Sequence, residues 1–228
     1  MRRRVPCLSK LHVPARLTWC QERVEWTQDQ WDRISFSDES KFNLYGSDGR
    51  RYCRRDVGEE YLPQNVDERV KHGGGSVMVW GCITARGTGR LHRIVGNLNA
   101  AGLCDIYQES LLGTFDDYWM TINNVIFQED NDSKHTSRLA REWRATNDVT
   151  RLNWPANSPD LNPIENTWNE VDCRMRMRSR QPHTLDELWL ALPEEWKSLD
   201  FRYIRNLYTS MNRCVTAVAE NKGLWTRY

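Results

Sequence analysis

The segment that most constrains the fold is an apolar run, Ser76-Val-Met-Val-Trp-Gly-Cys-Ile83, which follows the glycine-rich stretch His72–Gly75. A run this apolar predicts a central strand that is buried within its sheet. Gly87 and Gly89 favour a turn into a second stretch, Leu91–Val95, so the strand begins a hairpin. The rest of the chain must therefore supply the layers that cover this sheet.

The remaining segments predict both hairpin strands and strands that alternate with helices. We expect further strands at 34–38, 41–45, 124–130 and 149–153, with a hairpin turn at Asp48–Gly49. We expect helices at 14–26, 27–31, 100–120 and 134–146, another that begins at Pro163, and two in the tail that carry Thr184–Leu192 and Ile204–Val218. This order indicates a mixed sheet covered by helices, in an α/β or α+β layered domain.

Composition excludes several classes of protein. The 11 Trp, 8 Tyr and 5 Phe supply too many core-forming side chains for a disordered chain. No apolar run approaches the roughly 18 residues of a membrane span, and the N-terminus lacks the apolar stretch of a secretory signal. The seven cysteines form neither a disulfide framework nor a zinc-ligand spacing, so we expect free thiols in a reducing intracellular compartment.

The formal net charge is only +1, but basic residues are clustered. One cluster lies within residues 1–26, a second within Arg50–Arg55, and a third consists of Arg174, Arg176, Arg178 and Arg180. Each cluster taken singly is explained by a solvated surface. Three such clusters in a chain of neutral total charge favour a polyanionic partner.

The glycine triplet at 73–75 does not support a nucleotide or hydrolase site. A phosphate-binding loop would continue through Gly-Lys-Ser/Thr into a helix, whereas Ser76 begins a strand. The His-Gly-Gly-Gly sequence also resembles the oxyanion loop of lipases, but the chain contains no Gly-x-Ser-x-Gly elbow. We therefore expect a flexible turn before the central strand.

Three acidic residues are the strongest candidates for a catalytic site. Asp38 has the strand parity of Ile34 and Phe36, so it should share their core-facing side. Asp130 ends an apolar strand, and Glu165 lies at a helix start. Glu165 could instead close a capping box with Asn162, and its local sequence alone favours that alternative. Taken together, the three carboxylates suit a magnesium site, where two ions could promote displacement at a phosphodiester.

Three sequence blocks around these acids are similar to the signature blocks of Tc/mariner-superfamily transposases. They are Ser37-Asp-Glu-Ser-Lys-Phe42, Phe127-Gln-Glu-Asp-Asn-Asp-Ser-Lys-His-Thr136 and Trp154-Pro-Ala-Asn-Ser-Pro-Asp-Leu-Asn-Pro-Ile-Glu-Asn166. The 34 residues between Asp130 and Glu165 match the spacing of the Tc-type branch. The resemblance extends from about Leu8 to the C-terminus.

This resemblance implies an RNase H-like fold in which Asp38, Asp130 and Glu165 bind two Mg²⁺ or Mn²⁺ ions. It places Asn131 and His135 beside the site as supporting residues, although His135 could equally well only pack in the first turn of helix 134–146. Ser133 departs from the proline that is usual in the family. The implied activity is metal-dependent DNA cleavage and strand transfer in cut-and-paste transposition.

The resemblance also divides the chain into three parts. We expect a basic lead with N-terminal helices at 1–32, an RNase H-like catalytic core at 33–180, and C-terminal helices packed on that core at 181–228. Family members carry a helix-turn-helix region before the catalytic domain, and we expect this chain to lack one. Binding to DNA by this chain alone should then be weak and unselective.

The expected partners are transposon ends and target DNA, with a second copy or a full-length transposase as a further partner, and the expected location is the nucleus. The arginines at 174, 176, 178 and 180 should contact DNA phosphates, in a segment where the helix from Pro163 frays or ends. Two alternatives stay open. One is a metal-dependent nuclease without strand transfer, and the other is a non-catalytic DNA-binding or partner module derived from a transposon.

Overall fold

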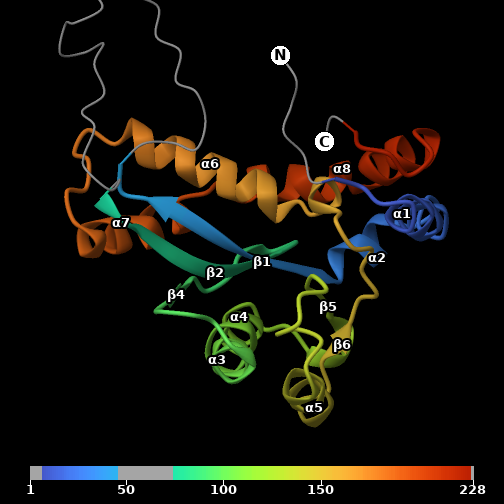
Figure 1. The fold of residues 1–228 in the computed structure, drawn as a ribbon, viewed down its shortest axis with the longest axis horizontal. Helices are drawn as coiled ribbons and strands as arrows, with labels where there is room; N and C mark the ends of the chain where they lie inside the picture. The colour runs from blue at the N-terminus through green and yellow to red at the C-terminus, as the bar shows by residue number, and fades with distance from the viewer. Residues whose placement is uncertain (1–6, 46–73, 227–228) are drawn as a thin grey trace, which may run out of the picture.

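A six-stranded mixed sheet lies between two layers of helices in the computed structural model, which describes residues 7–45 and 74–226 (Figure 1). The basic residues at 2–4 and 50–55 and the expected turn at Asp48–Gly49 lie outside the described residues. The strands run β3-β2-β1-β5-β6, and β4 also pairs with β2. They are β1 (Ile34–Asn43), β2 (Ser76–Thr84), β3 (Gly87–Thr88), β4 (His92–Ile94), β5 (Ile126–Gln128) and β6 (Thr150–Arg151).

Figure 1 shows α6, α7 and α8 on one side of the sheet and α3, α4 and α5 on the other. The helices are α1 (His12–Gln21), α2 (Gln28–Asp32), α3 (Ala100–Ile106), α4 (Leu112–Asp117), α5 (Arg138–Thr146), α6 (Ile164–Met177), α7 (Leu185–Lys197) and α8 (Phe201–Glu220). β1 is antiparallel to β2 and parallel to β5, so the sheet is mixed as the sequence predicts. Within the described residues, no helix combines the length and the apolar character that a membrane span requires.

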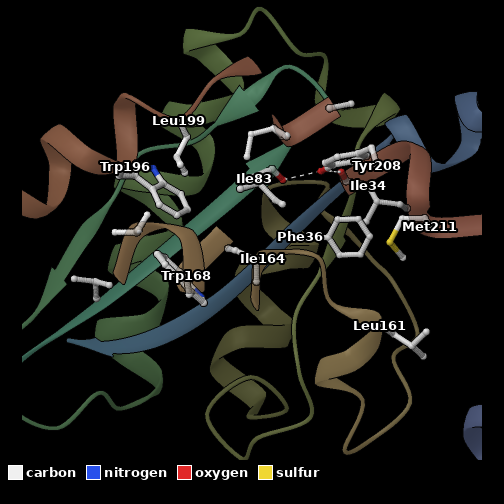
Figure 2. Packing of buried hydrophobic residues seen from close by; sticks show 14 of the residues in the cluster. Ile34, Phe36, Ile83, Leu161, Ile164, Trp168, Trp196, Leu199, Tyr208 and Met211 are labelled. Carbon is white, nitrogen blue, oxygen red and sulfur yellow. Dashed lines mark hydrogen bonds between the residues drawn. The ribbon is translucent and has the colours of Figure 1, made fainter. Parts of the chain in front are cut away.

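The first hydrophobic core fills the face covered by α6, α7 and α8. Phe36 of β1 packs edge-on against Tyr208 of α8, with ring centroids 5.6 Å apart (Figure 2). The Tyr208 hydroxyl lies 2.8 Å from the carbonyl oxygen of Ile34 and 2.9 Å from that of Ile83. A buried tyrosine needs such a polar partner. These contacts fix α8 across β1 and β2.

The second core lies on the opposite face, where Trp80, Tyr107 and Phe127 are buried. Val79 and Ile83 of β2 belong to the first core and Trp80 and Cys82 to the second, so β2 is buried on both faces. The prediction of a central strand at 76–83 is confirmed. The hairpin is also confirmed, because β3 and β4 both pair with β2 in antiparallel register.

Several expected elements differ in their extent. The helix expected at 14–26 is α1 at His12–Gln21, and the strands expected at 124–130 and 149–153 are the shorter β5 and β6. β1 is one continuous strand, where the sequence suggested two, because Phe36–Asn43 pairs with β2 without a break. The helix expected at 100–120 contains a π-helical turn at Tyr107–Leu111. The helix expected from 134 begins at Arg138, because the Ser137 side chain caps it by accepting a hydrogen bond from the Ala140 amide.

Candidate active site

The parallel pairing of β1 with β5 brings Asp38 and Asp130 to one pocket. Phe36 is directly paired with Gln128. Side chains two residues apart on a strand point to the same face, so Asp38 lies on the face of Phe36, as its parity predicted. Asp130 lies two residues beyond the end of β5 and lines the same pocket as Asp38. The face of Phe36 is the side that α6 covers (Figure 1).

Helix α6 brings Glu165 to the same place. Trp168 follows Glu165 by three residues, on the same face of the helix. Its ring stacks on Trp196 of α7 at 4.6 Å and packs against Gly81 of β2, the residue paired with Asp38. A Cβ atom at Gly81 would lie 2.7 Å from the Trp168 ring, so glycine is needed for this approach. The first turn of α6 is thereby held over the middle of β1.

All three predicted acids line one pocket of about 380 Å³. The other lining residues are neutral except for one further acid, and they are Gln128, Asn131, Asp132, Trp154, Ala156, Asn157, Ser158, Pro159 and Asn162. No basic side chain is among them. Oxygen ligands of this kind suit Mg²⁺ or Mn²⁺. The acids are not preassembled around an ion, since no three His, Cys, Asp or Glu side chains of the described residues already form a metal-binding group.

The pocket disfavours the charged forms of its acids. Burial, together with the negative charges of Glu165 and Glu39, raises the pKa of Asp38 well above its usual value. Burial also raises the pKa of Glu165. A bound cation would offset both effects, because it stabilises the ionised carboxylates. The structure therefore fits the oxygen-ligated cation site expected from the sequence.

The capping alternative for Glu165 does not match the geometry. A capping box would require the Glu165 carboxylate to accept the amide hydrogen of the residue that precedes the helix. The Asn162 amide instead donates to the carbonyl of Pro159, at 2.9 Å, and Pro163 has no amide hydrogen. The Asn162 side chain caps the helix by itself, through its Oδ1 atom and the Ile164 amide at 3.4 Å.

Asn131 and His135, the two expected supporting residues, occupy different places. Asn131 Nδ2 donates to the carbonyl of Trp154 at 2.8 Å, so it holds the wall of the pocket. His135 Nε2 lies 3.3 Å from Asp130 Oδ1 and 3.4 Å from Glu39 Oε1. His135 lies in a turn before α5 rather than in the first turn of that helix. Its role in catalysis stays a prediction.

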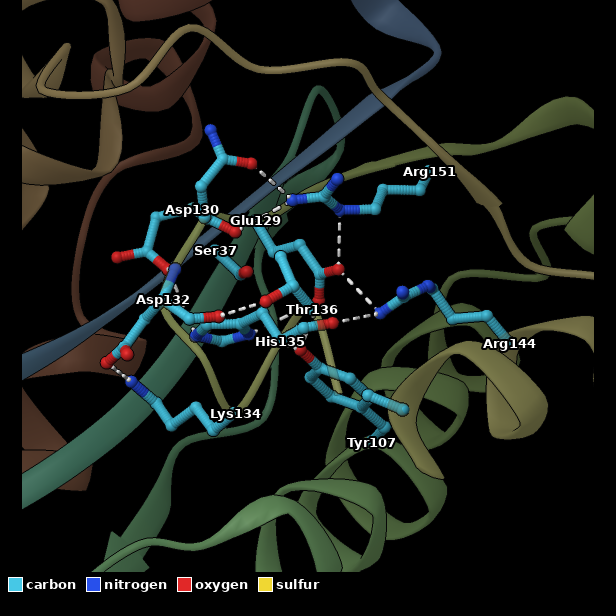
Figure 3. Close-up of polar contacts among 12 residues, drawn as sticks. Ser37, Tyr107, Glu129, Asp130, Asp132, Lys134, His135, Thr136, Arg144 and Arg151 are labelled. Carbon is cyan, nitrogen blue, oxygen red and sulfur yellow. Dashed lines mark hydrogen bonds and ion pairs between the residues drawn. The ribbon is translucent and has the colours of Figure 1, made fainter. Parts of the chain in front are cut away.

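Beneath His135 lies a buried ionic network centred on Glu129 (Figure 3). Glu129 Oε1 accepts from Arg144 Nη1 at 2.6 Å and lies 2.7 Å from Arg151 Nε, while Oε2 accepts from the Tyr107 hydroxyl. Burial opposes ionisation of Glu129, but hydrogen bonds from His135 and Tyr107 and the charge of Arg144 hold its pKa below the usual value. Burial opposes the charged form of His135, but hydrogen bonds to Glu129 and Glu39 and the charges of these carboxylates raise its pKa to about 9.

The arginines at 174–180 are engaged in ion pairs within the protein. Their partners lie on α6 and α7 and are Glu170 for Arg174, Asp172 for Arg176, Glu194 and Glu195 for Arg178, and Glu187 for Arg180. α6 ends at Met177, within this run, as expected. At 1.5 Å per residue, the run begins about 14 Å along the helix from Glu165. Contact with DNA phosphates stays a prediction.

Sequence reasoning missed Glu129, Gln128 and Asn162 as residues that build the site. Asn162 was interpreted only as a helix cap. Gln128 has the strand parity of Asp130, which could have placed it on the pocket side. No local signal marks Glu129 as the centre of a network, because its arginines come from α5 and β6.

Comparison with known proteins agrees with this architecture. Residues 33–189 match the family described as DDE superfamily endonuclease. The chain is 40% identical over 227 residues to the transposable element Tc1 transposase of Caenorhabditis elegans, an alignment that covers 98% of this chain and 80% of the relative.

Two solved structures share the fold, which confirms the RNase H-like expectation. The Mos1 mariner paired-end complex with Mn superposes with a TM-score of 0.83 at 18% identity, over 100% of this chain and 67% of that one. The catalytic domain of Mos1 mariner transposase superposes with a TM-score of 0.73 at 15% identity, over 99% and 100% of the two chains. The chain therefore belongs to the DDE superfamily endonucleases and is a transposase catalytic domain of the Tc1 type.

Proposed function

We propose that this chain cleaves and joins DNA strands at the pocket lined by Asp38, Asp130 and Glu165, with two Mg²⁺ or Mn²⁺ ions as cofactors. The observation that carries the proposal is the convergence of the three acids, from β1, the segment after β5 and the start of α6, on one pocket without basic lining residues. DNA phosphate could not approach such a pocket unless cations offset the carboxylate charge. The Mos1 paired-end complex, which shares the fold, contains Mn.

Each acid has a part that follows from its position. Asp38 and Glu165 are the more buried pair, and burial, which raises the pKa of both, opposes the ionised forms that a bound cation would stabilise. Asp130 is more exposed, with half of its side chain accessible, so it faces the side from which DNA arrives. When bound, a pair of divalent ions would activate the attacking oxygen and stabilise the leaving oxygen. The protein itself orients the strands and ions.

DNA is the proposed partner, both as transposon ends and as target, and a second copy of the chain or a full-length transposase is a further proposed partner. The nucleus is the proposed location. Fluorescence imaging of the tagged chain tests that location, and a diffuse signal excluded from nuclei would contradict it.

The test is a plasmid assay with two readouts. Nicking of supercoiled plasmid in Mg²⁺ or Mn²⁺ reports cleavage, and joining of a labelled oligonucleotide 3′-hydroxyl to the plasmid reports strand transfer. Glu165→Gln should lower both rates at least 100-fold, because it removes a charged ligand but keeps the side-chain size. Glu170→Gln, on the same helix outside the pocket, is the matched control and should stay within twofold of the unaltered chain.

Three outcomes would contradict the proposal in different ways. Nicking that persists in EDTA would exclude a metal-dependent site. Equal rates for Glu165→Gln and the unaltered chain would remove Glu165 from the site. Metal-dependent nicking without any joining would favour the nuclease alternative.

A further inference from the structure

The backbone ladder between β1 and β5 ends immediately before the first acid. The paired register runs from Ile34 with Ile126 to Phe36 with Gln128. Beyond that pair the Ser37 amide donates to Gln128 Oε1 at 3.1 Å, and the Ser37 hydroxyl donates to the Gln128 carbonyl at 2.8 Å. Side chains thus replace the ladder at Ser37. β5 ends at Gln128, and the pocket lined by Asp38 and Asp130 lies just beyond the end of this ladder.

Asn162 provides a further side-chain hydrogen bond to Ser37, from the loop that precedes α6. Its Nδ2 atom donates to the Ser37 carbonyl at 3.2 Å, adjacent to Asp38. Its Oδ1 atom accepts from the Ile164 amide at 3.4 Å, and its own carbonyl accepts from the Glu165 amide at 3.2 Å. Asn162 is only 7% exposed, so water does not readily substitute for these bonds. One buried amide side chain therefore joins the strand of Asp38 to the helix of Glu165.

We propose that Asn162 is a positioning residue that sets the separation of Asp38 and Glu165 and thereby the affinity of the site for divalent cations. This inference rests on the proposed function. Asn is suited to the task because one planar group offers a donor to Ser37 and an acceptor to Ile164. Asp has no donor when ionised, and Ser is too short to reach across the pocket.

The physical need for such a link comes from the state of the acids. They line one pocket but are not preassembled as a three-ligand group within the described residues. Bringing like charges together costs free energy, which the cation must supply on binding. A fixed link between β1 and α6 lowers that cost, since it limits how far the two carboxylates can move apart. Partners that orient metal ligands typically change metal affinity by about 10–100-fold.

A role in capping α6 alone would give a different result. Loss of a cap lowers the stability of the fold but leaves metal affinity unchanged in the folded protein. The informative variant is therefore Asn162→Ser, because Ser can cap the helix but cannot reach the Ser37 carbonyl. The matched control is Asn99→Ser, which makes the same change at the cap of α3, where Asn99 Oδ1 accepts from the Gly102 amide.

The experiment measures the Mn²⁺ dissociation constant of each folded variant by electron paramagnetic resonance, well below its melting temperature. We expect Asn162→Ser to raise the constant about tenfold or more and Asn99→Ser to leave it within twofold. Plasmid nicking should also distinguish the two variants, because only Asn162→Ser should change its dependence on Mn²⁺ concentration. Asn162→Ser should require more Mn²⁺ for half-maximal rate and should recover most of the rate at saturation.

Each outcome has a definite consequence. A dissociation constant for Asn162→Ser within twofold of the unaltered chain would overturn the inference and leave the proposed function standing. An unaltered chain without saturable Mn²⁺ binding would overturn both. If Asn162→Ser does not unfold cooperatively, Asn162→Thr is measured instead, because Thr also caps a helix, fills more of the space and fails to reach Ser37.

Discussion

Glu129→Gln tests the buried network that supports the wall behind Asp130. The Glu129 side chain is fully buried and that of Arg144 is 8% exposed. Gln keeps the size of Glu but has one oxygen instead of two, so its NH₂ group must face either the two arginines or the pair formed by Tyr107 and His135. Removing one partner from a buried ion pair typically costs about 3–5 kcal/mol, because the other charge stays buried without compensation.

The matched control for Glu129→Gln is Glu142→Gln. Glu142 pairs with Arg138 on the surface of α5, where their side chains are 57% and 85% exposed. Exposed pairs of this kind contribute about 0.3–0.5 kcal/mol. Unfolding in urea, followed by circular dichroism at pH 7, measures the free energy of unfolding of both variants. For a domain of this size, the expected loss in Glu129→Gln corresponds to a melting temperature about 6–20 °C lower.

A loss below about 1 kcal/mol in Glu129→Gln would refute this reasoning, since it would put the buried pair on a level with an exposed one. A loss of equal size in both variants would refute it as well, because it would show an effect of the substitution rather than of burial.

The remaining predictions concern packing, charge and DNA contact. Gly81→Ala should lower the free energy of unfolding by about 1–3 kcal/mol in urea unfolding, because its methyl group would overlap the Trp168 ring; an unchanged value would contradict the packing. Asp38→Asn should raise the melting temperature in EDTA at pH 7–8, where ionisation of this high-pKa carboxyl opposes folding, and should abolish stabilisation by Mn²⁺. The pKa of His135 is raised to about 9, so its protonated form should add up to about 3 kcal/mol to the free energy of unfolding below pH 6.5, and this stability should be lost as the pH rises through 9. His135→Asn should reduce the difference between the free energies of unfolding measured in urea at pH 6.5 and 9.5. Replacing the four arginines of Arg174–Arg180 with Ala should reduce the salt dependence of DNA binding, and an unchanged slope would leave them as intramolecular ion-pair partners alone.

The central strand and the helix caps were predictable from sequence because their causes are local. The apolar residues at 76–83 would face both sides of a strand, which predicts burial on both faces, and β2 is buried on both faces. Thr27 and Gln30 have the spacing of a capping box, and both hydrogen bonds of that box form at the start of α2. Element ends were less predictable. α5 begins at Arg138, after the Ser137 cap, rather than at residue 134, because the Asp132 carbonyl accepts the His135 and Thr136 amides in a preceding turn.

The convergence of the three acids on one pocket was predictable from the set but not from any single position. The local sequence favoured a cap role for Glu165, and only the pattern of all three carboxylates indicated a cation site. What the sequence could not reveal is which partners each side chain meets through long-range contacts. Arg16 of α1 is an example. Its buried guanidinium donates two hydrogen bonds, at 2.7 and 2.6 Å, to Asp160, which lies in the turn Pro159–Leu161 beside the pocket. The sequence of α1 alone does not predict that contact, because the two residues are 144 positions apart.

The proposed function requires Asp38, Asp130 and Glu165 to hold the divalent cations together. A crystal structure with Mn²⁺, with data collected at an energy where manganese scatters anomalously, tests this requirement. We predict one or two anomalous peaks in the pocket, about 2.0–2.6 Å from carboxylate oxygens of all three residues. Manganese bound only elsewhere, or coordinated without Glu165 while its carboxylate points away from the pocket, would contradict the proposed function.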